Sequence, residues 1–171
     1  EATALITPSE YLRRRCLEYL EAPLEKTLVA RVGVDPVFGT KQSTIIEPPY
    51  LVVFNDPLTA PRMPWLREVI EKRPDDFPGT IVVVGARCGD EPVQWGPRIV
   101  RIEDCPGTTL TGLYQHCMMF LYPTLHDASA LRVLEALRAG ARVLTAGTGA
   151  LAELAGAAPV YYNPASTASL L

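Results

Sequence analysis

The sequence has few of the residues that build metal, redox and membrane sites. Its 171 residues include only two histidines and four cysteines, and no two cysteines form a C-x-x-C pair. We therefore expect no metal site and no redox motif, and scattered thiols of this kind favour a reducing compartment, the cytoplasm. The longest apolar runs, such as 81–85 and 118–122, are too short to span a bilayer, so we expect no transmembrane segment and no signal peptide.

An excess of charge of one sign is also missing. The formal net charge is −3, charged residues make up 20% of the chain, and both signs are spread along it. No basic segment is dense enough to predict binding to nucleic acid. The run Arg13–Arg15 is a candidate anion site. Three consecutive residues of a helix point in different directions, however, so a solvated face is the favoured interpretation.

What the chain does have is an alternation of apolar strands and amphipathic helices. Continuous apolar runs such as "TIVVVG" at 80–85 are typical of a parallel sheet that is covered on both faces. The pattern predicts an α/β fold with a doubly wound parallel sheet, whose ligands bind at the carboxyl ends of the strands. We expect strands at 27–32, 50–54, 80–85, 98–102, 118–122, 142–145 and 160–162, and helices at 64–73, 109–117, 130–139 and 151–155.

A further helix is predicted near the start of the chain. Thr7, Pro8 and Glu10 form a capping box, with Thr7 as N-cap and Pro8 in the first helical position. The loop that follows the strand at 27–32 is rich in Gly, Pro, Ser and Thr, and it is expected to be irregular up to Pro49.

The stretch "PTLHDASALRVLEALRAGARV" at 123–143 carries the best candidate site. Asp127 lies in the loop after a strand, and seven residues separate it from Glu135 in the following helix. A helix N-terminus offers free N–H groups and the positive end of a dipole, which suit an anion. Glu135 can accept hydrogen bonds from sugar hydroxyls. The alternative is that Asp127 is a loop or capping acid and Glu135 a helix-surface acid.

Weaker candidates lie elsewhere in the chain. The segment "GTGALAE" at 147–153 could bind phosphate at a helix N-terminus, but it lacks the glycine and lysine spacing of a nucleotide-binding fingerprint. His126 is either a sugar contact or a solvated loop histidine. The adjacent pair His116-Cys117 and the residues Trp65 and Trp95 are expected to have packing roles.

Taken in order, these motifs resemble the donor-binding half of family 4 glycosyltransferases, which have the GT-B fold. That family has a P-S-x-x-E-G-F-G-L-P-x-x-E-A block, followed by G-x-P-V and a later acid near a glycine. The upstream segments "ALITPSEYLRRRCLEYL" and "VGVDPVF" resemble the helix that closes the family's first domain and its N-G-V-D-x-x-F linker. The matching positions of the block are Pro123, Thr124, Asp127, Leu131, Glu135, Ala136, Gly140, Val143, Leu144, Glu153, Gly156, Asn163 and Pro164.

The resemblance implies an organisation and an activity. Residues 1–171 would form one Rossmann-like donor-binding domain, the C-terminal half of a GT-B enzyme. Residues 1–40 would carry the linker helix and loop from a missing N-terminal domain that holds the acceptor. The activity implied is retaining transfer of a hexose from a nucleotide-diphosphate sugar, with no metal and no cofactor.

The resemblance also implies roles for particular residues. Glu135 would bind the ribose hydroxyls of the nucleotide. Asp127 would stand where the first glutamate of the family's E-x7-E pair contacts the transferred sugar. The backbone N–H groups near the sugar and the diphosphate would be those of Ala128, Ser129, Ala130 and Leu131.

The sequence departs from the family pattern where the diphosphate would bind. The family's Gly-Arg pair is replaced by Asn55-Asp56, and its lysine by Met63, with Arg62 adjacent as a possible substitute. Losing both cations would remove much of the stabilisation of the leaving group. The flexible Gly-Phe-Gly reads 128–130 Ala-Ser-Ala, and the linker asparagine is Val32. The alternative function is therefore a degenerate glycosyltransferase-like domain that serves as an interaction or scaffold module with a protein partner.

Overall fold

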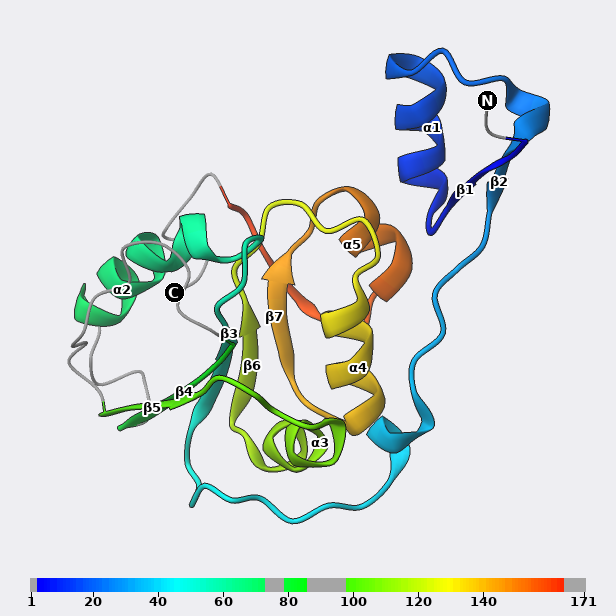
Figure 1. Cartoon of the computed structure of the whole chain (residues 1–171). Helices are drawn as coiled ribbons and strands as arrows, with labels where there is room; N and C mark the ends of the chain where they lie inside the picture. Colours follow the sequence, from blue (N-terminus) through cyan, green and yellow to red (C-terminus); the bar gives the residue numbers. More distant parts are fainter. Residues whose placement is uncertain (1–2, 73–78, 86–97, 165–171) are drawn as a thin grey trace.

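A six-stranded, fully parallel sheet forms the centre of the computed structural model, which describes residues 3–72, 79–85 and 98–164 (Figure 1). The strand order is β5-β4-β3-β6-β7-β8, and each neighbouring pair is parallel. This confirms the predicted doubly wound α/β fold. The strands are β3 (Leu51–Phe54), β4 (Thr80–Val84), β5 (Arg98–Ile102), β6 (Met119–Tyr122), β7 (Val143–Ala146) and β8 (Val160–Tyr162).

Helices cover both faces of this sheet because alternate strand residues point to opposite sides. On one face α2 (Met63–Lys72) packs on Val53, Val83 and their neighbours. On the other face a second core joins Val52, Phe54, Phe120 and Tyr122 to three helices. These are α3 (Gly107–His116), α4 (Leu131–Ala139) and α5 (Gly149–Ala155).

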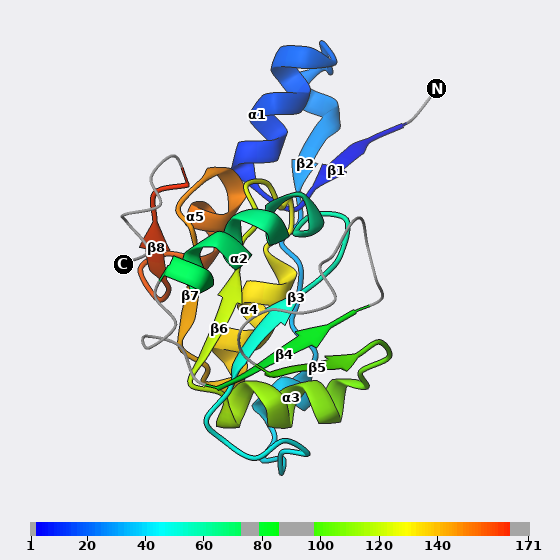
Figure 2. The same cartoon turned by 90° about the vertical axis from the view of Figure 1, so that its left-hand side faces the viewer.

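Residues 5–29 form a separate layer beside α5. Strands β1 (Leu5–Thr7) and β2 (Thr27–Val29) pair in parallel, with α1 (Glu10–Tyr19) between them. Figures 1 and 2 both show this unit set apart from the six-stranded sheet, with the start of α1 toward α5. Beyond β2 the chain runs to the short 3-10 turn η2 (Pro36–Gly39), which packs against α3 and α4.

The predicted start of α1 is wrong by two residues. Ser9, not Thr7, is the N-cap, and its Oγ accepts a hydrogen bond from the N–H of Leu12 at 3.1 Å. Thr7 is unavailable for that role because it ends β1, where its carbonyl accepts from the N–H of Ala30 at 2.9 Å. Strand β1 was not predicted, since three residues carry too little pattern to reveal a strand.

Other predicted boundaries shift by a few residues. The helices predicted to start at 109 and 151 begin at Gly107 and Gly149, and β2 ends at Val29 rather than at 32. Two further 3-10 turns, η1 (Leu24–Lys26) and η3 (Ala60–Arg62), precede β2 and α2. Cys88 and Trp95 lie outside the described residues. Within those residues, no helix combines the length and apolar character that crossing a membrane requires.

Candidate functional site

The loop between β6 and α4 folds back on the carboxylate of Asp127. Its Oδ1 accepts hydrogen bonds from the N–H groups of Ser129 at 2.8 Å and Ala130 at 3.0 Å. The Oγ of Ser129 in turn accepts from the N–H of Leu131 at 3.3 Å. The expectation of free N–H groups at the start of α4 is therefore wrong for these three residues. Asp127 is thus a loop acid that holds the turn before α4, whose N-cap, Ala130, has no side-chain capping bond.

The second oxygen of Asp127 is held by the end of β6. The hydroxyl of Tyr122 donates to Oδ2 at 3.1 Å. Burial, reinforced by the charge of Asp127, raises the pKa of Tyr122, so the hydroxyl stays protonated and remains a donor. Asp127 is thus a fixed carboxylate at the carboxyl edge of the sheet.

Ala130 occupies a backbone conformation that favours glycine. It has a φ of +52° and is fully buried, directly before the first residue of α4. A left-handed conformation costs a residue with a Cβ about 1–2 kcal/mol. The family block has glycine at this position, and here the hydrogen bond from Ala130 to Asp127 helps to hold alanine in the same turn.

Glu135 is a buried member of a charge pair and not the surface acid of the alternative interpretation. Its side chain is 9% exposed, and its Oε2 accepts a hydrogen bond from Nη1 of Arg132 at 3.0 Å. Burial raises the pKa of Glu135, Arg132 opposes that shift, and Asp35, the N-cap of η2, adds to it. The carboxylate on α4 is therefore close to charges of both signs.

Arg132 is a site residue that the sequence analysis did not select. Its guanidinium carbon lies 4.6 Å from the centre of the Phe54 ring, at the end of β3, and its side chain is 41% exposed. A signal was present, because residues three apart in a helix lie on the same side. Arg132 thus places a cation at the carboxyl edge of β3, where the Gly-Arg pair of the family is missing.

The residues that replace this pair shape a turn. Oδ1 of Asp56 accepts from the N–H groups of Leu58 at 2.9 Å and Thr59 at 3.0 Å, just before η3. Asn55 is buried, and its N–H donates to the carbonyl of Val84 at 2.9 Å. A Cβ at Gly85 would lie 2.5 Å from the carbonyl oxygen of Asn55. Here the chain requires close contact between neighbouring strand ends.

Arg62 is engaged away from the α4 loop. Its guanidinium carbon lies 4.4 Å from the centre of the Trp65 ring, and its Nη2 donates to the carbonyl of Pro164 at 3.1 Å. Trp65 stacks on Tyr162 with ring centres 5.4 Å apart, on the face that α2 covers. The packing role expected of Trp65 is confirmed, and Arg62 shares it.

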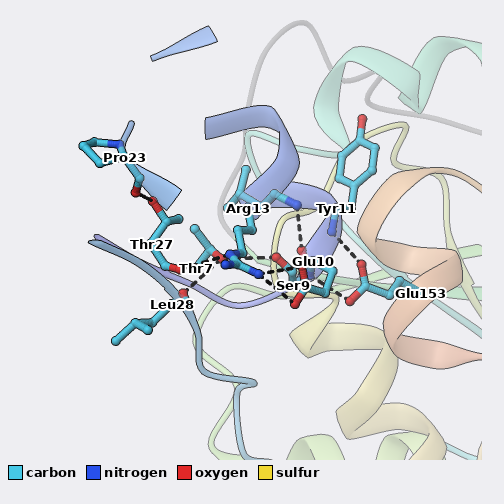
Figure 3. Close-up of polar contacts among 10 residues, drawn as sticks. Thr7, Ser9, Glu10, Tyr11, Arg13, Pro23, Thr27, Leu28 and Glu153 are labelled. Atoms are coloured by element: carbon cyan, nitrogen blue, oxygen red, sulfur yellow. Dashed lines mark hydrogen bonds and ion pairs between the residues drawn. The ribbon is translucent and has the colours of Figure 1, made fainter. Parts of the chain in front are cut away.

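The N-terminal layer closes against the same edge of the sheet. The carboxylate of Glu153 in α5 accepts from the N–H of Glu10 at 2.9 Å and from the N–H of Tyr11 at 2.7 Å (Figure 3). Next to this contact is a pocket of about 120 Å³ between Tyr11 and Leu12 of α1, residues 125–128 and residues 148–150. It contains Asp127 and His126, and the sequence did not predict that α1 would form one of its walls.

The adjacent candidates His116 and Cys117 each contact a backbone carbonyl. Nε2 of His116 lies 3.1 Å from the carbonyl oxygen of Gln42, and the Cys117 thiol contacts the carbonyl of Tyr114 at 3.2 Å. Burial raises the pKa of Cys117 to about 12, so it remains a thiol. No group of three or more His, Cys, Asp or Glu side chains that could hold a metal ion occurs in the described part of the chain.

Comparison with known proteins identifies the architecture. No family model and no curated protein matches the sequence. A trehalose-6-phosphate synthase, OtsA, aligns over 98% of this chain and 50% of its own, with 14% identity and a TM-score of 0.69. An alpha,alpha-trehalose-phosphate synthase (UDP-forming) from Burkholderia vietnamiensis aligns over 98% of this chain and 49% of its own, with 12% identity and a TM-score of 0.68. AviGT4, a glycosyltransferase involved in avilamycin A biosynthesis, aligns over 93% of this chain and 50% of its own, with 17% identity and a TM-score of 0.62.

The chain spans about half the length of these solved structures. At such low identity the likeness concerns the fold, and the roles of individual residues have to come from the site itself. The chain has the Rossmann-like α/β fold of a GT-B glycosyltransferase, matched over about half of such an enzyme.

Proposed function

We propose that this chain is the donor-binding domain of a retaining glycosyltransferase of the family 4 type. It would bind a nucleotide-diphosphate sugar and transfer the hexose to an acceptor held by an N-terminal domain that precedes these residues. The observation that carries the proposal is the Glu135–Arg132 pair at the carboxyl edge of the sheet. In an open α/β sheet this edge is where ligands bind.

The two members of the pair suit the two parts of a nucleotide diphosphate. Oε2 of Glu135 is bonded to Arg132, whereas its Oε1 has no hydrogen-bond partner among the residues described. A carboxylate oxygen in that state can accept from the vicinal hydroxyls of a ribose. The half-exposed guanidinium of Arg132 would supply positive charge to the diphosphate, in place of the cations lost at Asp56 and Met63.

Asp127 would serve the transferred sugar. It lines the 120 Å³ pocket together with His126, and its position is fixed by Tyr122 and by the loop. A carboxylate with oxygens already bonded can still accept from a sugar hydroxyl, because each oxygen has more than one lone pair. Neither a metal nor a cofactor takes part in this proposal.

A second candidate rests on the same loop. Because Asp127 and Ser129 already occupy the N–H groups of residues 129–131, a diphosphate would have to displace them to use the start of α4. A domain in which they are never displaced would be a glycosyltransferase-like interaction module. Nucleotide binding separates the two functions.

The test is calorimetric titration with UDP, GDP and ADP. We expect saturable binding of one nucleotide, weakened about tenfold or more by Glu135→Gln, as for the loss of a charged hydrogen-bond acceptor. Glu68→Gln is the matched control: it makes the same chemical change on α2, where Glu68 pairs with Lys72. No binding of any nucleotide at millimolar concentration, or an equal loss in Glu68→Gln, would favour the interaction module.

Retention has its own test. The protein is incubated with the nucleotide sugar that matches the preferred nucleotide, and the anomeric configuration of the product is read by proton NMR. Products with the configuration of the donor support retention, and inverted products contradict it.

A further inference from the structure

One hydroxyl in the core beside α4 is buried without a hydrogen-bond partner. Tyr114, in α3, is fully buried, and its hydroxyl makes no hydrogen bond in the part of the chain that the structure describes. Two other buried tyrosines of the same core do bond: Tyr50 donates to the carbonyl of Leu113 at 3.0 Å, and Tyr122 donates to Asp127 at 3.1 Å. A buried donor without a partner is costly and rare, so the Tyr114 hydroxyl requires an explanation.

The ring that carries this hydroxyl is held in place by its neighbours. Tyr114 packs edge to face with Phe120, with ring centres 5.0 Å apart, and its ring centre lies 6.3 Å from that of Phe38 in η2. Both partners belong to the buried core that joins the sheet to α3 and α4. Moving the ring toward a distant acceptor would break this packing. An acceptor for the hydroxyl therefore has to come to it.

The charged side chains that act on the hydroxyl come from α4. Helices α3 and α4 are in contact, and Val133 and Ala136, close to Glu135 in sequence, belong to the same core as Tyr114. Burial raises the pKa of Tyr114 well above its ordinary value, the charge of Glu135 adds to the rise, and that of Arg132 opposes it. The hydroxyl therefore stays protonated and can donate to a carboxylate.

The proposed function makes two demands on Arg132. In the structure its Nη1 donates to Oε2 of Glu135 at 3.0 Å. A diphosphate at the carboxyl edge of the sheet would attract the same guanidinium. When Arg132 turns to the diphosphate, the carboxylate of Glu135, whose side chain is only 9% exposed, loses this donor. A buried carboxylate that loses its partner is strongly destabilising, so the turn requires a replacement donor.

We propose that Tyr114 is a positioning residue for Glu135, and that its hydroxyl replaces Arg132 on the carboxylate when a nucleoside diphosphate binds. The carboxylate moves to the fixed hydroxyl, Arg132 is released to the diphosphate, and the other oxygen of Glu135 stays available to the ribose. Glu135 remains ionised, because one charge-assisted hydrogen bond takes the place of another. The event that releases Arg132 rests on the proposed function, whereas the bond from Tyr114 to a released Glu135 does not.

The first experiment needs no nucleotide and uses urea unfolding of the parent protein, Tyr114→Phe, Arg132→Ala and the double variant. In the parent, Tyr114→Phe removes a hydroxyl without a partner, so it should not lower the unfolding midpoint. In Arg132→Ala the hydroxyl bonds to the released carboxylate. Adding Tyr114→Phe there should raise the equilibrium constant for unfolding about tenfold, as for the loss of a hydrogen bond to a charged group. The same effect in both backgrounds would overturn the replacement bond.

The second experiment is calorimetric titration of the parent protein and Tyr114→Phe with UDP, GDP and ADP. For the nucleotide that the parent binds, Tyr114→Phe should raise the Kd about tenfold, although the free variant is at least as stable as the parent. A purely structural role of Tyr114 would not weaken binding without weakening the fold. In a Glu135→Ala background, where no acceptor remains, adding Tyr114→Phe should change the Kd by less than about twofold.

Tyr162→Phe is the matched control for the titrations. The Tyr162 hydroxyl is also buried without a hydrogen bond in the described residues, but it belongs to the core on the other face of the sheet, which α2 covers. Its removal should change the Kd by less than about twofold. A loss equal to that of Tyr114→Phe would show a general effect on packing and overturn the assignment. Circular dichroism checks that the variants are folded.

The outcomes separate this inference from the proposed function. Nucleotide binding that Tyr114→Phe does not weaken would show that Arg132 keeps its bond to Glu135 in the complex, and it would overturn the inference alone. The absence of nucleotide binding to the parent protein at millimolar concentration would overturn the proposed function and with it the role of Tyr114 in binding. The urea experiment would still decide whether Tyr114 bonds to Glu135 once Arg132 is removed.

Discussion

Two regions near Asp127 differ in whether their charged side chains are hydrogen-bonded. At the carboxyl edge of the sheet, Asp56 and Asp127 accept from backbone N–H groups, and Glu135 accepts from Arg132. In the pocket between α1 and α5, Arg14 and Arg31 make no such contact with the described residues. Paired charges stabilise the loops that hold them, whereas exposed charges without partners contribute little to the fold. Substitutions in the first region should therefore lower stability, and substitutions in the second should leave it nearly unchanged.

The largest effect is expected from Arg132→Ala. This change leaves Glu135 buried without its partner, which should lower the free energy of unfolding at pH 7 by about 2 kcal/mol, less than for a fully buried pair because Arg132 is half-exposed. Urea unfolding of the variant and the parent protein measures the loss. The double variant Arg132→Ala with Glu135→Gln should recover much of it, since no buried charge then remains.

The stability loss of Arg132→Ala should also depend on pH. Burial raises the pKa of Glu135 above its ordinary value of 4.5, and losing Arg132 raises it further. A carboxyl with a raised folded pKa favours folding when it is protonated, and this contribution is lost as the pH rises through the folded pKa. The deficit of Arg132→Ala should therefore be small below pH 4.5 and full at pH 7. Equal deficits at both pH values would contradict the assigned cause.

A smaller loss is expected from Asp127→Ala. The variant removes the acceptor for the N–H groups of Ser129 and Ala130 and for the Tyr122 hydroxyl, at a cost of about 1–2 kcal/mol, as for donors left without an acceptor. Asp127→Asn keeps an oxygen in the Oδ1 position and should cost less than half as much. Chemical denaturation compares the two variants, and an equal loss in both would show that the charge of Asp127 matters here and not its hydrogen bonds to the loop.

A local effect is expected from Glu153→Ala. Its carboxylate holds the first N–H groups of α1, so its removal should speed hydrogen exchange at Glu10 and Tyr11 about tenfold, equivalent to about 1.4 kcal/mol of local opening. Glu18→Ala is the control, because Glu18 pairs with Arg15 within α1 itself. Unchanged exchange in Glu153→Ala would show that the layer is held by its apolar contacts.

The smallest effect is expected at Arg14 and Arg31. Arg14→Gln combined with Arg31→Gln should change the free energy of unfolding by less than about 0.5 kcal/mol, as is usual for exposed positions without partners. Urea unfolding of this double variant and of Arg132→Ala under the same conditions compares the two losses of stability. A loss as large as that of Arg132→Ala would show that these arginines stabilise the fold, and the distinction between the two regions would fail.

Much of the fold was predictable because its elements carry local patterns. The apolar run at 80–85 predicted a buried parallel strand, and β4 has four buried residues in succession. Glu135 was predictable as a site residue from its place after a strand and a loop, but not as a buried one. Arg132 is its neighbour within α4, whereas Asp35, about a hundred residues earlier in the chain, comes close to its charge only in the folded chain.

The site could be predicted less completely than the fold. Arg62 lies close in sequence to where a phosphate cation was expected, yet it stacks on Trp65 and bonds to Pro164, about a hundred residues away. Periodicity says nothing about such distant partners. Periodicity could not identify the N-cap of α1 either. Ser9 has that role because Thr7 ends β1, which pairs with β2.

The sequence by itself determined the α/β class, the order of the main elements and the position of Asp127 and Glu135 at one edge, since these depend on hydrophobic periodicity and turn residues. Only the tertiary structure decided which charges are paired. Ion pairs and caps depend on distances of a few ångströms between segments far apart in the chain, such as Glu153 and the start of α1. For the same reason only the folded chain reveals that Tyr11 of α1 lies on Gly149 and lines the pocket that contains Asp127.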